Sequence, residues 1–213
     1  MLSGIFSTAI MRGWCGENPI LKVESEKIVE DRIIPLNKEE IERVMSATES
    51  YNGGACHAAT AIMLYARVRS HETARLSWKD VHFPASVAEA PYAEATGVIV
   101  ISPQHSKTGG ARCVTILPLL ARILRHIQKA DHERICPPNW RRLWAGLHKA
   151  AGFSHWQPDV LRHTFATHHL ATFRSYAKLQ LEMGHRSAEL LRTRYVAMEG
   201  LLRYRRGESM LVG

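Results

Sequence analysis

The chain has 213 residues, 46% hydrophobic and 23% charged, so it can bury the core of one good-sized domain and does not have a disordered composition. Its net charge is +8, and residues 101–213 carry eighteen Lys and Arg against seven Asp and Glu, which favours a polyanionic partner such as nucleic acid. The four cysteines form no C-x-x-C pair, which argues against a zinc ribbon and a disulfide framework and fits a reducing cytosol. The longest apolar run is too short to span a membrane.

The first 36 residues indicate a helix followed by a linker. Residues 1–13 are largely apolar but lack the basic region and cleavage site of a signal peptide. They predict a helix whose apolar face (Ile5, Phe6 and Ile10) is exposed and packs on itself or on a neighbour. Residues 16–36 are charged and poor in helix signals, and we interpret them as an extended linker.

Two helices and a third amphipathic segment are predicted next. Asn37, followed by Glu40 three residues later, has the pattern of a capping box at a helix start. Residues 56–68 are apolar and rich in alanine, which indicates a buried helix. In "RVRSHETARLSWKDV" (67–81), Glu72 lies at helical spacing from Arg69 and Arg75, which is typical of a helix that runs into a strand.

The middle of the chain predicts a β-hairpin and the remainder predicts helices. Two β-branched runs, 98–101 and 113–117, flank a Ser-Lys-Thr-Gly-Gly turn that contains Lys107. Pro118 starts a helix expected to reach about residue 130, residues 139–153 form another, and three short amphipathic segments follow Pro158. The predicted fold class is therefore mainly α with a small antiparallel β-sheet, an α+β architecture.

The stretch "DVLRHTFATHHL" (159–170) raises the question of a metal site. Neither the spacing of His163 and His168 nor the adjacent pair at 168 and 169 places two imidazoles on one helical face, and no carboxylate lies at a suitable offset. We therefore expect no metal and interpret His163 as a core-facing, hydrogen-bonded side chain.

Five residues, each unremarkable alone, together suit phosphoryl transfer to a protein side chain: Arg69, Lys107, Arg162, His185 and Tyr195. Two guanidiniums can grip the oxygens of a phosphodiester and stabilise the charge of the transition state. Clustered positive charge favours the phenolate of a nucleophilic tyrosine. A lysine on a turn can protonate the leaving oxygen, and a histidine can donate a further hydrogen bond. Arginine and lysine supply the charge neutralisation that Mg²⁺ supplies elsewhere, so no cofactor is expected.

The order and spacing of these residues resemble the tyrosine recombinases, or phage integrases. "RSHETARLSWKD" is similar to the family's R-x-x-E-x-x-x-L-x-W-x-D motif, and "HSKTGGARCVTIL" resembles its lysine-bearing hairpin. "LRHTFATHHL" resembles the helix of the second arginine, and "MGH" followed by "RY" resembles the histidine and nucleophile segment. The resemblance runs from about residue 36 to residue 198.

The resemblance implies a role for each member of the set. Arg69 and Arg162 would clamp the scissile phosphate, Lys107 would be the general acid, His185 a phosphate ligand, and Tyr195 the nucleophile that forms a 3′-phosphotyrosyl link. Glu72 would support Arg69. We also expect DNA contacts from three further cations: Arg112, Arg186 and Arg194.

The resemblance also implies a domain organisation and partners. Residues 1–18 would be the last helix of a mostly missing core-binding domain, 19–36 a linker, 37–198 the catalytic domain, and 199–213 a tail or helix. The implied partner is double-stranded DNA, with a tetramer on DNA. The short C-terminal segment favours a monomer in solution, and the short apolar runs favour no membrane. The implied location is the cytoplasm of a prokaryote, in association with DNA.

Two departures from the family pattern leave alternatives open. Asp159 stands where the family has the histidine of H-x-x-R, and would either repel a phosphate, hold Arg162 or His163, or cap the helix as its N-cap. Ala66-Arg67 replaces the usual Thr-Gly. The chain is thus either a recombinase catalytic domain, a truncated and catalytically weak DNA-binding remnant, or an unrelated basic helical protein.

Overall fold

The structure, a computed structural model, describes residues 2–23, 33–83, 96–104 and 110–173, together with Ser175 and Leu179, and gives Thr172 and Phe173 by backbone alone. The chain divides into two compact units, Met1–Arg32 and Ile33–Gly213. No helix in the described part of the chain is long and apolar enough to span a bilayer.

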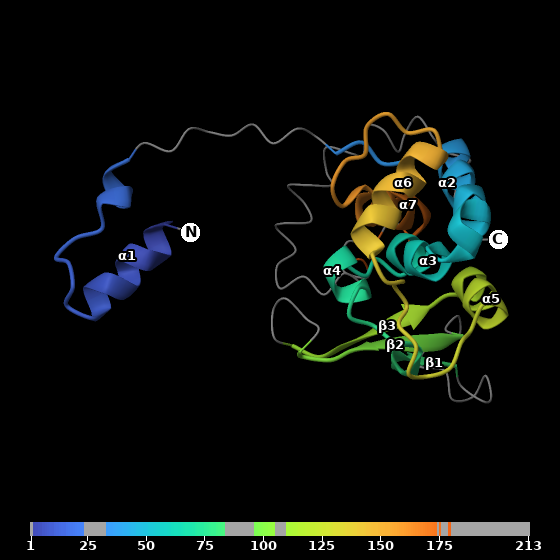
Figure 1. The fold of residues 1–213 in the computed structure, drawn as a ribbon, viewed down its shortest axis with the longest axis horizontal. Helices are drawn as coiled ribbons and strands as arrows, with labels where there is room; N and C mark the ends of the chain where they lie inside the picture. Colours follow the sequence, from blue (N-terminus) through green and yellow to red (C-terminus); the bar gives the residue numbers. More distant parts are fainter. Residues whose placement is uncertain are drawn as a thin grey trace. The chain divides into compact units, whose positions relative to one another are not determined.

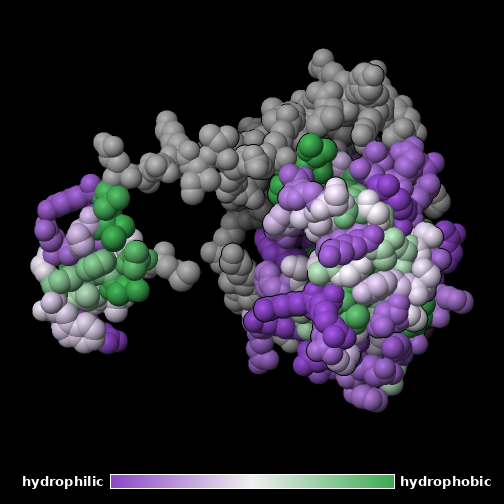
Figure 2. All heavy atoms as spheres, turned by 45° about the horizontal axis from the view of Figure 1, so that its top comes forward, coloured by the Kyte–Doolittle hydropathy of each residue, from purple (hydrophilic) through white to green (hydrophobic). Residues whose placement is uncertain are grey.

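The N-terminal unit consists of helix α1 (Leu2–Met11) and the 3₁₀ helix η1 (Pro19–Lys22). Asn18 joins the two, because its side chain caps η1 by accepting from the N–H of Ile20 and also donates to the carbonyl of Ser3 at 3.2 Å. α1 buries none of its residues, and apolar side chains gather on the surface of this unit in Figure 2. The predicted exposed face is confirmed for Ile5 and Ile10, whereas Phe6 is half-buried. The expectation of an extended segment is wrong at η1, where Pro19 starts a helical turn.

The larger unit begins with helices α2 (Lys38–Ser50) and α3 (His57–Tyr65), joined by the 3₁₀ turn η2 (Tyr51–Gly54). The predicted capping box is confirmed: the Asn37 side chain accepts from the N–H of Glu40 at 2.8 Å, and the Glu40 carboxylate accepts from the N–H of Asn37 at 2.8 Å. All residues of α3 are buried, as its alanine-rich sequence predicted.

The segment after α3 is more broken than the sequence suggested. Helix α4 covers only Ser70–Thr73, and the 3₁₀ turn η3 (Trp78–Asp80) leads into the short strand β1 (Val81–His82). Leu76, between α4 and η3, and Trp78, the first residue of η3, are almost completely buried, which anchors the segment in the core.

Strands β2 (Gly97–Ile101) and β3 (Arg112–Ile116) form the predicted hairpin, and β1 adds a third antiparallel strand in the order β1-β2-β3. The register pairs Gly97 with Ile116 and Ile101 with Arg112. Alternate residues of β2 and β3 face the core, since one side of the sheet is packed and the other is not.

Three further helices complete the described part: α5 (Pro118–His126), α6 (Trp140–Ala150) and α7 (Val160–Phe173). α5 ends before the expected residue 130, because Ile127 leaves the helical conformation and its N–H turns back to the carbonyl of Leu124. α3 lies among the other helices, in contact with α2, α4, α5 and α7, while the sheet lies at one edge of the unit (Figure 1). One core cluster runs from the inner face of the sheet through α3 to the start of α7.

Candidate active site

Arg69 and Glu72 lie at the two ends of one helical turn, where α4 begins. Arg69 is the N-cap residue, and its N–H donates to Glu72 Oε2 at 3.1 Å. The Arg69 guanidinium contacts the same carboxylate at 3.4 Å, from Nη1 to Oε1. Glu72 therefore contacts both the backbone N–H and the guanidinium of Arg69. Arg75 makes a different contact from the one expected, since its Nη1 donates to the carbonyl of Gln104 at 3.1 Å.

A second guanidinium, that of Arg112 on β3, holds Glu72 more tightly. Arg112 Nη1 donates to Glu72 Oε1 at 3.0 Å, and Nη2 donates to Oε2 at 2.8 Å. This two-pronged geometry is the strongest form of an arginine–carboxylate pair. The Glu72 side chain has no solvent exposure, while those of Arg69 and Arg112 are 22% and 17% exposed.

Electrostatics keep the buried Glu72 ionised. Burial alone would raise the pKa of this carboxyl, but the hydrogen bonds and charge of Arg112, together with those of Arg69, outweigh it and hold the pKa below its usual value. The cluster of one carboxylate and two guanidiniums thus carries a net positive charge.

Arg162 enters the same region from α7. Its side chain is buried, and Nη1 donates to the backbone carbonyl of Arg67 at 2.7 Å. Because Arg67 precedes Arg69 by two residues, this bond brings the segments of the two predicted phosphate-binding arginines together. Arg162 therefore contacts the segment that leads into Arg69.

Arg67 has a backbone conformation that favours glycine. Its φ is +50°, in the left-handed region, at the position where the family pattern has Gly. Its buried guanidinium lies over the ring of Phe165 on α7, 5.1 Å from the ring centroid. The side chain of Arg67 thus attaches the end of α3 to α7, while its carbonyl fixes Arg162.

Asp159 occupies the N-cap position of α7, because its carbonyl accepts the first helical hydrogen bond, from the N–H of His163 at 3.0 Å. Its φ is +57°, a left-handed value that Asp and Asn tolerate better than most residues. The expectation of a side-chain cap is not met: among the described residues the exposed Asp159 carboxylate accepts no hydrogen bond. Asp159 therefore places an exposed carboxylate three residues before Arg162.

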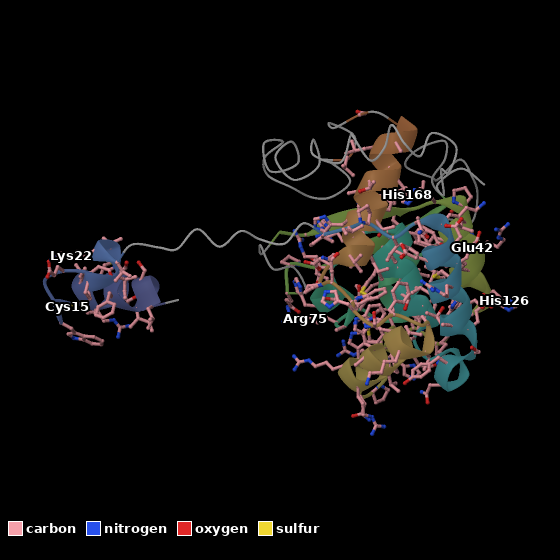
Figure 3. The ribbon with its side chains drawn as sticks, turned by 90° about the horizontal axis from the view of Figure 1, so that it is seen from above. Cys15, Lys22, Glu42, Arg75, His126 and His168 are labelled. Atoms are coloured by element: carbon pink, nitrogen blue, oxygen red, sulfur yellow. The ribbon has the colours of Figure 1, made fainter. Side chains whose placement is uncertain are left out.

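The histidines of α7 face the interior. His163 is buried, as predicted, and His168 is buried with its Nε2 3.3 Å from the carbonyl of Leu36 (Figure 3). Thr164, one turn earlier on α7, also binds Leu36, since its Oγ1 accepts from the N–H of Leu36 at 2.9 Å and donates to the carbonyl of Val160. These contacts fix the chain that enters α2 against α7. Among the described residues, no three His, Cys, Asp or Glu side chains gather to hold a metal ion.

Five of the predicted site residues lie outside the described residues: Lys107, His185, Arg186, Arg194 and Tyr195. The structure brings together Arg69, Glu72 and Arg112, and it joins the segments that carry Arg69 and Arg162. An open hollow of about 1260 Å³ lies elsewhere, against η2, the end of α5 and the start of α6, and none of these four residues lines it.

Two features were missed from the sequence. The pairing of Arg112 with Glu72 spans 40 residues and has no local signal. The aromatic cluster of α6 had one, because Trp140, Trp144 and His148 recur every fourth residue. His148 stacks on Trp156 with ring centroids 3.9 Å apart, and burial lowers its pKa to about 4.

Comparison with known proteins gives one family. The model described as "Phage integrase family" matches residues 35–200. No curated protein sequence matches the chain significantly.

Several solved structures are similar in fold. XerA recombinase is 20% identical, with a TM-score of 0.59, over 88% of this chain and 70% of that one. The catalytic domain of bacteriophage HP1 integrase is 17% identical, with a TM-score of 0.59, over 81% and 95%. A lambda integrase fragment, residues 75–356, as a dimer bound to a core site is 19% identical, with a TM-score of 0.62, over 89% and 70%. At such identities the likeness shows the fold.

Proposed function

The chain belongs to the phage integrase family, as a tyrosine-type site-specific recombinase, and from this premise we propose that it cuts and rejoins DNA through a 3′-phosphotyrosyl link at Tyr195. The observation that carries the proposal is the meeting of the Arg69 and Arg162 segments through the Arg162–Arg67 hydrogen bond. Two guanidiniums on adjoining segments are the arrangement that a phosphodiester clamp requires.

Each residue has a defined part in the proposed reaction. Arg69 and Arg162 bind the non-bridging oxygens of the scissile phosphate, with His185 as a further donor. The Tyr195 phenolate oxygen attacks phosphorus and forms the P–O bond to the enzyme, while the bond from phosphorus to the 5′ oxygen of the next nucleotide breaks. Lys107 protonates that leaving oxygen. Rejoining is the reverse reaction with a 5′ hydroxyl as the nucleophile, so the phosphotyrosyl link conserves the energy of the broken bond.

Double-stranded DNA is the proposed partner. The similar structures include lambda integrase bound to DNA and an integrase of the Tn1549 transposon in complex with a circular intermediate DNA. The excess of Lys and Arg in residues 101–213 supports the same partner through phosphate contacts. We further propose a monomer in solution and a tetramer on DNA, with Arg186 and Arg194 as DNA contacts.

The proposed organisation assigns residues 37–198 to catalysis, 1–18 to the last helix of a core-binding domain, 19–36 to a linker and 199–213 to the tail. The chain spans 70% of the XerA chain and 54% of the XerH chain to which it is similar. The apolar surface of the N-terminal unit supports the assignment of residues 1–18, since a helix with no buried residue suits one that normally packs in a larger domain.

A nicked suicide duplex tests the proposal directly, because loss of the short fragment beyond the cut traps the phosphotyrosyl product. The expected result is a covalent protein–DNA adduct that withstands denaturant and disappears in Tyr195→Phe, which still retards the duplex in a gel. Retardation without an adduct from the unsubstituted chain would instead support a DNA-binding remnant. The exposed carboxylate of Asp159, three residues before Arg162 in the sequence, is the observation that favours this second function, because a negative charge near the site would oppose a phosphate.

A further inference from the structure

The Glu72 carboxylate is shared unequally by Arg69 and Arg112, and support of Arg69 alone does not explain this arrangement. Arg112 makes the two shorter side-chain contacts, 3.0 and 2.8 Å, one to each oxygen. The Arg69 guanidinium makes a single contact at 3.4 Å, at the limit of a hydrogen bond. The carboxylate therefore belongs mainly to Arg112, although Arg69 is the nearer residue in sequence.

The pairing of Glu72 with Arg112 changes the net charge that remains at Arg69. One ionised carboxylate paired with one arginine makes a neutral pair, and the two oxygens would occupy the fork of Arg69 that a phosphate also requires. With Arg112 present, the carboxylate is neutralised by a cation whose side-chain hydrogen bonds, among the described residues, are both with Glu72. Arg69 then keeps its positive charge and most of its donors for a ligand.

We propose that Arg112 is a positioning residue for the cleavage reaction: it holds the Glu72 carboxylate, so that Arg69 is oriented by this group without being neutralised by it. The inference rests on the proposed function of Arg69 as a phosphate ligand. It replaces the expectation that Arg112 itself contacts DNA.

The geometry of Arg112 disfavours a DNA contact. Both of its terminal nitrogens bind Glu72, and its Nε atom is buried. The side chain is 17% exposed and less open to solvent than that of Arg69, at 22%. Each terminal nitrogen of Arg112 is therefore already engaged by a carboxylate, with which a phosphate would have to compete.

Arg112 also connects the hairpin with the Arg69 segment. It is the first residue of β3, opposite Ile101 at the end of β2. The other arm is tied to the same segment, since Arg75 donates to the carbonyl of Gln104, three residues beyond β2. The hairpin is thus fixed at two points next to its turn against residues 69–75, and the Arg112–Glu72 pair is the ionic one of the two.

The test is a cycle of three variants of the full chain: Arg112→Gln, Glu72→Gln and the double variant. The readouts are the single-turnover rate of adduct formation at saturating protein on a nicked suicide duplex, and the dissociation constant with its salt dependence. In Arg112→Gln the carboxylate turns to Arg69, and the rate is expected to fall about 100-fold with a smaller change in affinity. In the Glu72→Gln background the same substitution is expected to change the rate by less than about threefold, because no carboxylate remains to capture Arg69.

Arg112→Lys guards against misfolding, since it keeps the charge balance of the buried carboxylate but lacks the two-pronged grip. Its melting temperature is expected near that of the unsubstituted chain, and its rate between those of the unsubstituted chain and Arg112→Gln. In the Glu72→Gln background, Arg112→Lys is again expected to leave the rate of adduct formation nearly unchanged.

Two outcomes overturn the inference alone. Equal loss of rate from Arg112→Gln in both backgrounds would show that Arg112 does not act through Glu72. A loss confined to affinity, with a shallower salt dependence, would restore the DNA contact. Absence of adduct from the unsubstituted chain would refute the proposed function, and the inference with it.

Discussion

Replacement of Arg67 by glycine and by alanine separates backbone strain from side-chain packing at the end of α3. Arg67 has φ +50°, and its buried guanidinium lies 5.1 Å from the centre of the Phe165 ring. Both substitutions delete the guanidinium and its contact with the ring. The loss of packing therefore cancels in the difference between the two variants, and the backbone term remains.

The magnitude follows from the conformation. A left-handed residue with a Cβ costs roughly 1–2 kcal/mol relative to glycine. The greater freedom of glycine in the unfolded chain returns about 0.4–1 kcal/mol of this. Arg67→Gly is therefore expected to be about 0.5–1 kcal/mol more stable than Arg67→Ala, or a few degrees in melting temperature for a domain of this size.

The assay is urea and thermal unfolding of both variants, followed by circular dichroism, with Ala66→Gly as the matched control. Ala66 is buried one residue earlier and has φ −120°, so a glycine there gains nothing from a left-handed backbone. The control is expected to lower stability by about 0.5–1 kcal/mol. An Arg67→Ala variant as stable as Arg67→Gly would refute the left-handed conformation at this position and the reason given for glycine in the family pattern.

Three other predictions test separate parts of the structure. Asp159→Asn keeps a side chain that tolerates φ +57° but removes the exposed charge three residues before Arg162. DNA affinity at low salt is therefore expected to rise about two- to fivefold, with the gain lost at high salt. Glu42→Gln on α2 is the matched control, and an equal gain in affinity there would show that the effect is one of net charge alone. Burial lowers the pKa of His148 from 6.5 to about 4, so between these values the unfolded chain binds more protons than the folded chain. The contribution of neutral His148 to the free energy of unfolding should therefore be fully present above pH 6.5 and should fall towards pH 4 by at most about 3 kcal/mol. In urea titrations, the free energy of unfolding of His148→Phe should depend less on pH, and an unchanged pH dependence would contradict the assignment. Thr164→Val leaves the buried N–H of Leu36 without its acceptor and is expected to lower the free energy of unfolding by about 1–3 kcal/mol. Thr60→Val is the control, because it loses only a bond to its own helix and should cost less. Equal losses in the two variants would contradict the hydrogen bond between Leu36 and Thr164.

The elements that could be predicted are those whose signals are local. The capping box at Asn37 needs residues three apart, α3 needs only an unbroken apolar run, and the hairpin needs two β-branched runs around a turn. Each signal lies within a few residues of the element it forms. The α+β class followed from these elements together, and the structure confirms it.

The predictions that were incomplete depend on tertiary contacts. Arg112 was expected to contact DNA from its charge alone, because nothing near it in the sequence indicates Glu72 as its partner. Asp159 was expected to cap α7 with its side chain, but the left-handed backbone leaves only its carbonyl in the capping position. The break of the helix after Thr73 follows from the burial of Leu76 and Trp78, which draws the chain into the core before another turn can form.

For the candidate site, too, part of the chemistry could be predicted from local sequence and part depends on tertiary contacts. The order of Arg69, Lys107, Arg162, His185 and Tyr195 indicated phosphoryl transfer from residue types and spacing. The hydrogen bond from Arg162 to the carbonyl of Arg67 adds what spacing could not supply, namely that two segments 95 residues apart are joined in the folded chain.

The most direct test of the account is the identity of the residue that becomes attached to DNA. The adduct formed on a nicked suicide duplex would be digested with nuclease and trypsin, and the nucleotide-bearing peptide identified by mass spectrometry. The nucleotide is expected on Tyr195, in the peptide that follows Arg194. A nucleotide on Tyr204, on any other residue, or on none would contradict it.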